Sequence, residues 1–182
     1  MPIRRSIVNS PARRRFVCGL GAGALLSVPV RAQADEVRSL AFDHLHTGEK
    51  LVVDYVVGGT YVASALASVN RLLRDFRTGD VAVIDTALLD LLHRLRELTS
   101  SRRPFQIISG YRSPATNAAL HQRSSGVASG SLHMLGQAID IRLADVPLAT
   151  LRDAARAMGG GGVGYYPASD FVHVDTGRVR SW

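Results

Sequence analysis

Cysteine, lysine and long apolar runs are scarce in this chain of 182 residues. The single cysteine, Cys18, lies in the N-terminal segment, and residues 35–182 contain none. A domain over those residues therefore has no disulfide, no cysteine-ligated zinc and no cysteine nucleophile. Lys50 is the only lysine and lies far in sequence from any motif, which argues against a serine–lysine hydrolase.

The longest apolar stretch, residues 17–30, is too short to cross a bilayer. It follows Arg13–Phe16, a twin-arginine pattern, and precedes Ala32–Ala34, which has the A-x-A form of a signal cleavage site. Residues 1–34 are therefore predicted to be a cleaved secretory signal that resembles a Tat signal. We expect the remaining domain, residues 35–182, to be periplasmic or otherwise exported, without a transmembrane anchor.

Removing this segment changes the charge of the chain. The whole chain has 22 Lys and Arg against 15 Asp and Glu, and six of the arginines but no acid lie in residues 1–34. Residues 35–182 therefore hold 16 basic against 15 acidic side chains. So small an excess does not favour nucleic-acid binding. The length suits a single domain with a sizeable core, and nothing in the pattern requires a partner subunit.

Hydrophobic spacing predicts a single α+β domain. Two apolar segments at 37–45 and 50–57 are typical of a β-hairpin, and helical spacing follows at 62–76 and from the N-cap Asp85 to about residue 98. The remaining expected elements are a strand at 104–109, a helix at 114–121, a loop at 122–130, a strand at 137–143, a helix at 148–158, and strands at 163–166 and 171–175. Because helices come first and short strands later, we expect a small antiparallel sheet with flanking helices.

Two histidines and an aspartate have the spacing of a metal site. His133 and Asp140 lie seven residues apart, Gly136 allows a tight turn between them, and His173 follows far downstream. Zinc binds neutral imidazole and carboxylate ligands at about 2.0–2.2 Å, and a set of three leaves a position open for water. An open position separates hydrolytic from structural sites. We predict that His133, Asp140 and His173 bind Zn²⁺.

Three segments carry a resemblance to a known family: Ser109–Pro114, Ser131–Asp140 and Asp170–Gly177. They resemble the M15-type zinc peptidases, and most closely the DUF882, murein-endopeptidase-like branch. The resemblance covers most of residues 35–182, including Arg74–Gly79. It implies the Hedgehog/D-Ala-D-Ala-peptidase α+β fold, zinc ligation by the three residues named above, and peptidoglycan stems or cross-links as the substrate.

Two residues are candidates for catalytic work beside the metal. Asp170, three residues before His173, is predicted to be the general base, provided that it lies in the turn before the strand, because residues three apart on a strand face opposite ways. Arg112 is predicted to bind the oxyanion or a substrate carboxylate, as the resemblance also suggests. Asp175 competes with Asp170 for the base role, but could instead be a fourth ligand or orient an imidazole. A structural role stays open for each.

Two other function classes remain alongside the peptidase. The first is a zinc-stabilised module that binds peptidoglycan without cutting it, and the second is an exported structural protein without a metal. The presence of both Asp170 and Arg112 beside the metal would separate a peptidase from a binding module. The pattern does not decide whether D,D or L,D bonds are cleaved, or whether the activity is that of an endopeptidase or a carboxypeptidase.

Overall fold

The computed structural model describes residues 36–123 and 128–182, so the predicted signal at 1–34 lies outside the described residues. Eight strands and four α-helices are present in the described part. The strands are β1 (Val37–His44), β2 (Lys50–Val57), β3 (Thr60–Tyr61), β4 (Phe105–Ser109), β5 (Ala138–Leu143), β6 (Gly162–Tyr166), β7 (Phe171–Asp175) and β8 (Arg180–Ser181). The helices are α1 (Ala63–Leu72), α2 (Thr86–Thr99), α3 (Pro114–Arg123) and α4 (Leu148–Met158), with 3₁₀ turns at Leu132–Leu135 and Pro167–Ser169.

The strands form one sheet in the order β3-β2-β1-β4-β5-β7-β6-β8. The predicted α+β class is confirmed, but the sheet is larger than expected and mixed. Five of the seven neighbouring pairs are antiparallel, whereas β1 pairs with β4 and β6 with β8 in parallel. The β1–β4 pair is parallel because β2, β3, α1 and α2 intervene along the chain and return it to the same end of the sheet.

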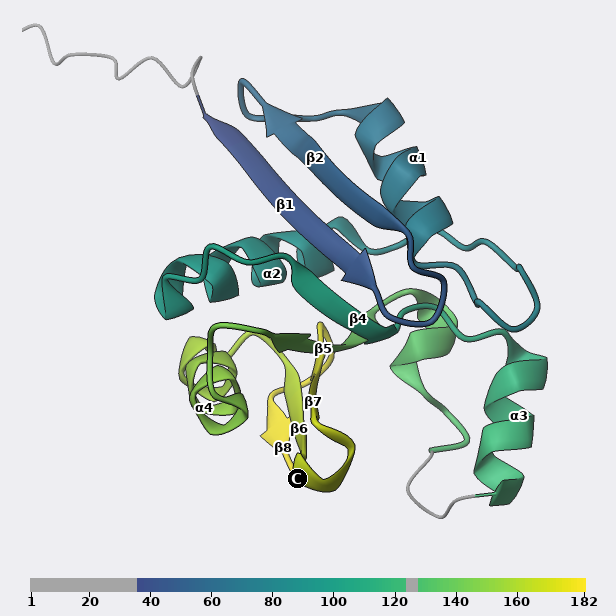
Figure 1. Cartoon of the computed structure of the whole chain (residues 1–182). Helices are drawn as coiled ribbons and strands as arrows, with labels where there is room; N and C mark the ends of the chain where they lie inside the picture. The colour runs from purple at the N-terminus through teal and green to yellow at the C-terminus, as the bar shows by residue number, and fades with distance from the viewer. Residues whose placement is uncertain (1–35, 124–127) are drawn as a thin grey trace, which may run out of the picture. The chain divides into compact units, whose positions relative to one another are not determined.

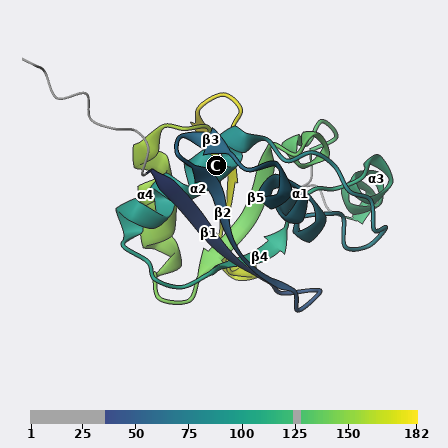
Figure 2. The same cartoon turned by 90° about the horizontal axis from the view of Figure 1, so that it is seen from above.

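The helices flank the strands on two sides. In Figure 1 and in the view from above in Figure 2, α2 and α4 lie together on one side, and α1 and α3 on the other. Helix α4 packs against α2 and against β5, β6 and β7, while α1 packs against β2. Helix α2 begins where predicted, because the Asp85 carboxylate accepts a hydrogen bond of 2.9 Å from Ala87 N.

Two predicted boundaries differ from the structure. Helix α1 ends at Leu72 rather than residue 76, because the Leu73 carbonyl accepts a hydrogen bond of 2.8 Å from Tyr111 N. The Asp75 carboxylate accepts a bond of 3.0 Å from Arg77 N, which closes a turn in place of a further helical turn. Helix α3 continues to Arg123, two residues past its expected end, and residues 124–127 of the predicted loop lie outside the described part.

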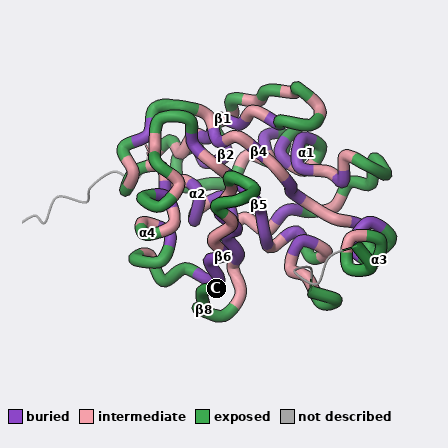
Figure 3. Tube along the Cα trace, turned by 60° about the horizontal axis from the view of Figure 1, so that its bottom comes forward, coloured by how far each residue is buried: buried purple, intermediate pink, exposed green. Residues whose placement is uncertain are grey.

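Strand alternation places polar side chains on the face of the sheet that turns away from the apolar core. On β5, Ile139 and Ile141 are fully buried in the core, so Asp140 between them points to the opposite face. Residues 138–141 of β5 are all buried, and Figure 3 shows this strand mainly in the colour of buried residues. On β7, Val172 and Val174 join the same core, so His173 faces the side of Asp140.

Candidate active site

Three separate elements bring the predicted metal ligands together. Asp140 on β5 pairs directly with His173 on β7 in the antiparallel register. His133 lies in the 3₁₀ turn Leu132–Leu135, which ends at Gly136. Gly136 has φ +67°, and a Cβ there would lie 2.2 Å from the Val83 carbonyl oxygen. Only glycine therefore fits the turn that carries His133 to the sheet.

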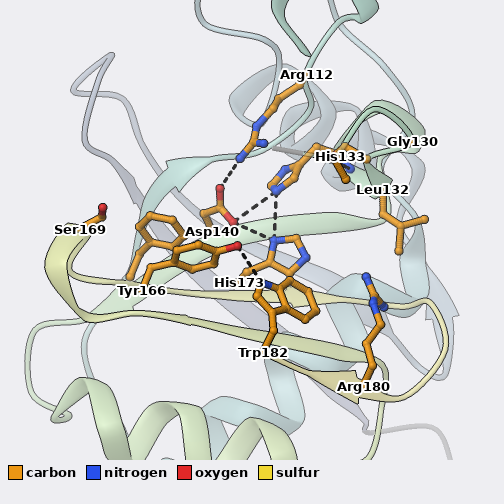
Figure 4. A pocket seen from close by; sticks show the side chains of 13 residues that line it. Arg112, Gly130, Leu132, His133, Asp140, Tyr166, Ser169, His173, Arg180 and Trp182 are labelled. Atoms are coloured by element: carbon orange, nitrogen blue, oxygen red, sulfur yellow. Dashed lines mark hydrogen bonds and ion pairs between the residues drawn. The ribbon is translucent and has the colours of Figure 1, made fainter. Parts of the chain in front are cut away.

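The three ligand atoms converge at one point. Asp140 Oδ1 lies 2.9 Å from His173 Nδ1 and 3.2 Å from His133 Nε2, and the two nitrogens are 3.2 Å apart (Figure 4). All three side chains are buried. Within the described residues this is the one group of three or more His, Cys, Asp or Glu side chains placed to hold a metal ion.

The partner of His133 fixes which ring nitrogen carries the proton. His133 Nδ1 lies 2.7 Å from the Gly110 carbonyl oxygen. A carbonyl oxygen only accepts, so Nδ1 carries the hydrogen and donates it. Burial lowers the pKa of His133, which outweighs the opposing effect of Asp140 and keeps the ring neutral. Its Nε2 therefore presents a lone pair to the other two ligands.

His173 is oriented in the opposite sense by Asp175. His173 Nε2 lies 3.1 Å from Asp175 Oδ2, so Nε2 donates and Nδ1 presents its lone pair to Asp140 Oδ1 when the ring is neutral. Burial alone would lower the pKa of His173, but the hydrogen bonds with Asp140 and Asp175 outweigh it and raise the pKa. The site thus favours a positive charge at this point.

These features fit a cation between the three residues. When both rings are neutral, two imidazole lone pairs and one carboxylate oxygen face each other with no proton between them. These electron-rich atoms repel one another unless a cation lies among them. Burial would raise the pKa of Asp140, but His133 and His173 hold it well below its ordinary value, so the carboxylate is ionised. Two nitrogens, one oxygen and second hydrogen bonds that fix each ring are typical of a metal centre.

Arg112 lies beside the third ligand. Its Nη2 donates to Asp140 Oδ2 and its Nε donates to Ser109 Oγ at 2.9 Å. The Arg112 backbone N–H also donates to the His133 carbonyl at 3.2 Å. The side chain lines the cleft described below, and its Nη1 has no hydrogen-bond partner among the described residues. Arg112 therefore supports Asp140 and still offers one N–H pair to the cleft.

Asp175 contacts His173 and is saturated with donors. Besides His173, its carboxylate accepts from Gly162 N and Gly177 N, both at 2.9 Å, and from Arg180 Nη1 and Nη2 at 3.1 and 2.7 Å. Burial would raise the pKa of Asp175, but these donors lower it well below its ordinary value. The side chain is 0% exposed. Asp175 is therefore placed to orient His173, and not to bind the cation or to take up a proton.

Asp170 is the one predicted site residue that the structure does not bring to the cluster. It lies in the turn before β7, as its predicted role required, with φ +54°. Its carboxylate, however, accepts from Arg142 Nη1, its side chain is 63% exposed, and it does not line the cleft. The carboxylate is therefore paired outside the ligand cluster, and the base role of Asp170 stays a prediction.

A cleft of about 510 Å³ opens over the predicted ligands His133, Asp140 and His173. Figure 4 shows Arg112 on one side of the ligands, with Tyr166 and Trp182 on the other. Neither aromatic residue belongs to a spaced motif, so the sequence pattern does not identify them as site residues. The lining residues are Arg112, Ala128, Gly130, Ser131, Leu132, His133, Asp140, Tyr166, Ser169, Phe171, His173, Arg180 and Trp182.

Comparison with known proteins assigns the family. A model of the Peptidase_M15_2 family, described as peptidoglycan L,D-endopeptidase MepK, matches residues 32–182. The chain belongs to this family. It is 43% identical over 177 residues to the peptidoglycan L,D-endopeptidase MepK of Escherichia coli K12, which covers 94% of this chain and 97% of that protein. It is 38% identical over 157 residues to the probable peptidoglycan L,D-endopeptidase MepK of Haemophilus influenzae, covering 86% of this chain and 84% of that protein.

Membership of the M15 peptidases confirms the resemblance drawn from the three sequence segments. The cluster of His133, Asp140 and His173 lies within the C-terminal half of the matched region. Among the described helices of this M15 peptidase, none is both long enough and apolar enough to cross a membrane.

Proposed function

We propose that the chain is an exported zinc peptidase that hydrolyses peptide bonds in peptidoglycan, with L,D bonds as the target. The observation that carries this proposal is the convergence of His133 Nε2, His173 Nδ1 and Asp140 Oδ1 under an open cleft. Family membership supports peptidoglycan as the substrate, and the names of the two relatives support the L,D specificity and endopeptidase activity.

His133, Asp140 and His173 would hold the zinc ion. When bound, zinc supplies a Lewis acid for the scissile carbonyl and lowers the pKa of a water molecule to about 7. The chain's own contribution is to keep His133 neutral and to aim both imidazoles at one point, through Gly110 and Asp175. The zinc ligands are thereby arranged before the metal binds, which avoids an ordering cost at each rebinding.

Arg112 is proposed to bind the substrate. Two of its three nitrogens are held by Ser109 and Asp140, so the guanidinium is fixed in direction and Nη1 remains for a carbonyl oxygen or a carboxylate. A fixed cation in a partly dry cleft stabilises developing negative charge more than a mobile one. Arg112 therefore has a binding role and a supporting role for Asp140.

Features of the sequence support the proposed export and the proposed partner. The twin-arginine pattern and the Ala32–Ala34 site support a cleaved signal over residues 1–34, and the family match beginning at residue 32 is consistent with a domain over 35–182. We propose a periplasmic location, where peptidoglycan is accessible. Near-neutral charge in residues 35–182 gives no support to nucleic-acid binding. The three proposed zinc ligands come from one chain, which supports a function that requires no oligomer.

One observation favours the alternative of a zinc-stabilised module that binds peptidoglycan without cutting it. Asp140 is the sole carboxylate among the described residues that line the cleft, and it is engaged by both imidazoles and Arg112. Among the described residues, no second carboxylate therefore lines the cleft to act as a separate base. Turnover decides between the two functions.

The experiment uses purified protein and muropeptides of defined linkage. Muropeptides with L,D and with D,D cross-links are incubated separately with protein, with and without a chelator, and the products are identified by mass spectrometry. We expect chelator-sensitive cleavage of the L,D linkage that returns with added zinc, and none with His133→Ala. Binding of muropeptides without any product at full zinc loading would replace the peptidase by the binding module.

A further inference from the structure

The cleft wall opposite Arg112 is built from two aromatic side chains. Tyr166 ends β6, and Trp182 follows the short strand β8 that pairs with β6. Both line the cleft. In Figure 4 the hydroxyl end of Tyr166 points toward the three metal ligands from the side away from Arg112. Neither residue belongs to the metal site described above.

The Tyr166 ring is fixed in place on two sides. It stacks on Phe171, with ring centroids 4.6 Å apart and an interplanar angle of 21°. A Cβ at Gly164 would lie 2.8 Å from atoms of both the Tyr166 ring and the Trp182 ring. Both rings therefore pack directly over the bare glycine, and any side chain at position 164 would displace them. Such packing holds the hydroxyl in one place before a substrate arrives.

Trp182 determines which way the Tyr166 hydroxyl donates. Trp182 Nε1 donates to the Tyr166 hydroxyl oxygen at 2.7 Å. An indole nitrogen is a donor only, so the Tyr166 oxygen must accept in this bond and its own hydrogen is left to donate elsewhere. No acceptor for that hydrogen is present among residues 36–123 and 128–182. The unused donor opens into the cleft.

Trp182 is itself held at its backbone and its ring. Its backbone N–H donates to Val163 O at 3.2 Å, and its carbonyl accepts from Tyr165 N at 3.0 Å. The Arg180 guanidinium lies 4.9 Å from the centre of its ring, and the His173 ring lies 5.3 Å away. A tryptophan that remains 51% exposed at the edge of the cleft is thus kept rigid by several contacts.

We propose that Tyr166 contacts the substrate during hydrolysis and donates a hydrogen bond to the scissile carbonyl oxygen as negative charge develops there, with Trp182 as the positioning residue that directs the hydroxyl. The inference rests on the proposed peptidase function and adds a second donor facing Arg112 across the ligands. A donor aimed in advance at developing charge stabilises the transition state more than the bound substrate. The effect is therefore expected in kcat rather than in KM.

The first test replaces Tyr166 by Phe, which removes the hydroxyl and keeps the stacked ring. We expect kcat on an L,D-linked muropeptide to fall about 10- to 100-fold, with KM within about twofold of the wild type. Tyr165→Phe is the matched control, because Tyr165 points to the other face of β6 and stacks with Arg152 at 4.5 Å. Zinc content and thermal unfolding are measured for both variants.

The second test asks whether Trp182 acts through Tyr166. Trp182→Phe removes the indole N–H and keeps an aromatic ring. We expect it to lower kcat in the wild-type background and to have little further effect in Tyr166→Phe, since the group it directs is then absent. A purely structural role of Trp182 would give the same loss in both backgrounds. A phosphinate analogue of the tetrahedral state should bind Tyr166→Phe about tenfold more weakly, while the muropeptide product binds equally.

The outcomes separate the two proposals. A wild type without turnover on any muropeptide overturns the proposed function, and the phosphinate comparison then also shows no difference. A wild type that cleaves, with Tyr166→Phe equally active and equally able to bind the phosphinate, overturns the role of Tyr166 and leaves the peptidase intact. A loss of zinc in Tyr166→Phe would equally contradict the inference, because it would assign the residue to the metal site.

Discussion

Two aspartates flank His173 at opposite ends of β7, and they have opposite surroundings. Asp170, three residues before His173, is 63% exposed and meets one partner, Arg142. Asp175, two residues after it, is 0% exposed and accepts hydrogen bonds from His173, two backbone N–H groups and Arg180. Two carboxylates at a similar distance along the sequence therefore differ, because Asp175 contacts a predicted metal ligand and Asp170 does not.

This contrast shows which property of a carboxylate decides its role. Donors around a buried carboxylate keep it ionised and fixed, which suits it for orienting an imidazole. An exposed ion pair is weak and easily exchanged for water. Asp75 extends the comparison beyond β7, because it is also buried and accepts from Ser113 N, Ser113 Oγ and Arg77 N at 2.9, 2.8 and 3.0 Å.

The largest effect is expected from removing the histidine between the two aspartates. His173→Ala takes one of three ligands from the centre and leaves Asp175 without its imidazole partner. We expect loss of bound zinc and a fall in kcat/KM of at least about a thousandfold. Metal analysis and muropeptide turnover measure both. His93→Ala, on α2 and paired with Glu97, is the control that should keep zinc and activity.

Replacing the buried Asp175 should weaken zinc binding without abolishing it. In Asp175→Asn the amide keeps the size of the carboxylate but loses its charge and disturbs the bond to His173 Nε2. We expect zinc affinity to fall about 10- to 100-fold, as for other partners of metal-bound histidines. Competition with a chelator of known affinity gives the value. An unchanged zinc affinity would assign Asp175 to folding alone.

Asp75 tests, away from the predicted metal site, whether donors around a buried carboxylate keep it ionised. Burial would raise its pKa, but bonds from Thr116, Ser113 and Arg77 lower the pKa to about 2 from an ordinary value of 3.8. Because the folded-state pKa is the lower one, this stabilisation is present above about pH 4 and is lost as the pH falls toward 2. Its full size is about 2 kcal/mol in the free energy of unfolding.

Urea unfolding of the wild type and Asp75→Asn between pH 5 and pH 2.5 isolates this contribution, since every other carboxylate titrates in both proteins. We expect the wild type to be more stable by about 2 kcal/mol at pH 5, and the difference to shrink steadily with acid. A difference that does not change with pH would mean that Asp75 stabilises the protein by its shape and not by its charge.

The smallest effect is expected from replacing the exposed Asp170. Asp170→Asn removes an exposed ion pair with Arg142, which is worth at most about 1 kcal/mol. We expect zinc content to be unchanged and kcat/KM to stay within about twofold of the wild type. A loss of a hundredfold or more with full zinc content would restore Asp170 as the general base and remove the contrast with Asp175.

The elements and the metal set could be predicted because both leave local patterns in the sequence. The period of two on β5 and β7 places Asp140 and His173 on one face, and the motif spacing identifies His133. The parallel pairing of β1 with β4 and the strands β3 and β8 could not be predicted, since they depend on long-range packing of very short segments.

The contacts around each site residue also could not be predicted from the sequence. Whether Asp170 or Asp175 contacts the ligand depends on Arg142, Arg180 and the backbone N–H of Gly162, which come from other strands. The same holds for the Tyr166–Trp182 pair, whose members are 16 residues apart and meet only because β8 pairs with β6.

The central claim is that one zinc ion is held by particular atoms whose orientation the chain fixes beforehand. Crystals of the zinc-loaded protein measured at the zinc absorption edge test it most directly. We predict one anomalous peak per chain, within about 2.0–2.2 Å of His133 Nε2, His173 Nδ1 and Asp140, with Asp175 on His173 Nε2 and Asp170 still on Arg142. A peak bound through His173 Nε2, a peak that includes Asp170, or no peak at this cluster would contradict the account.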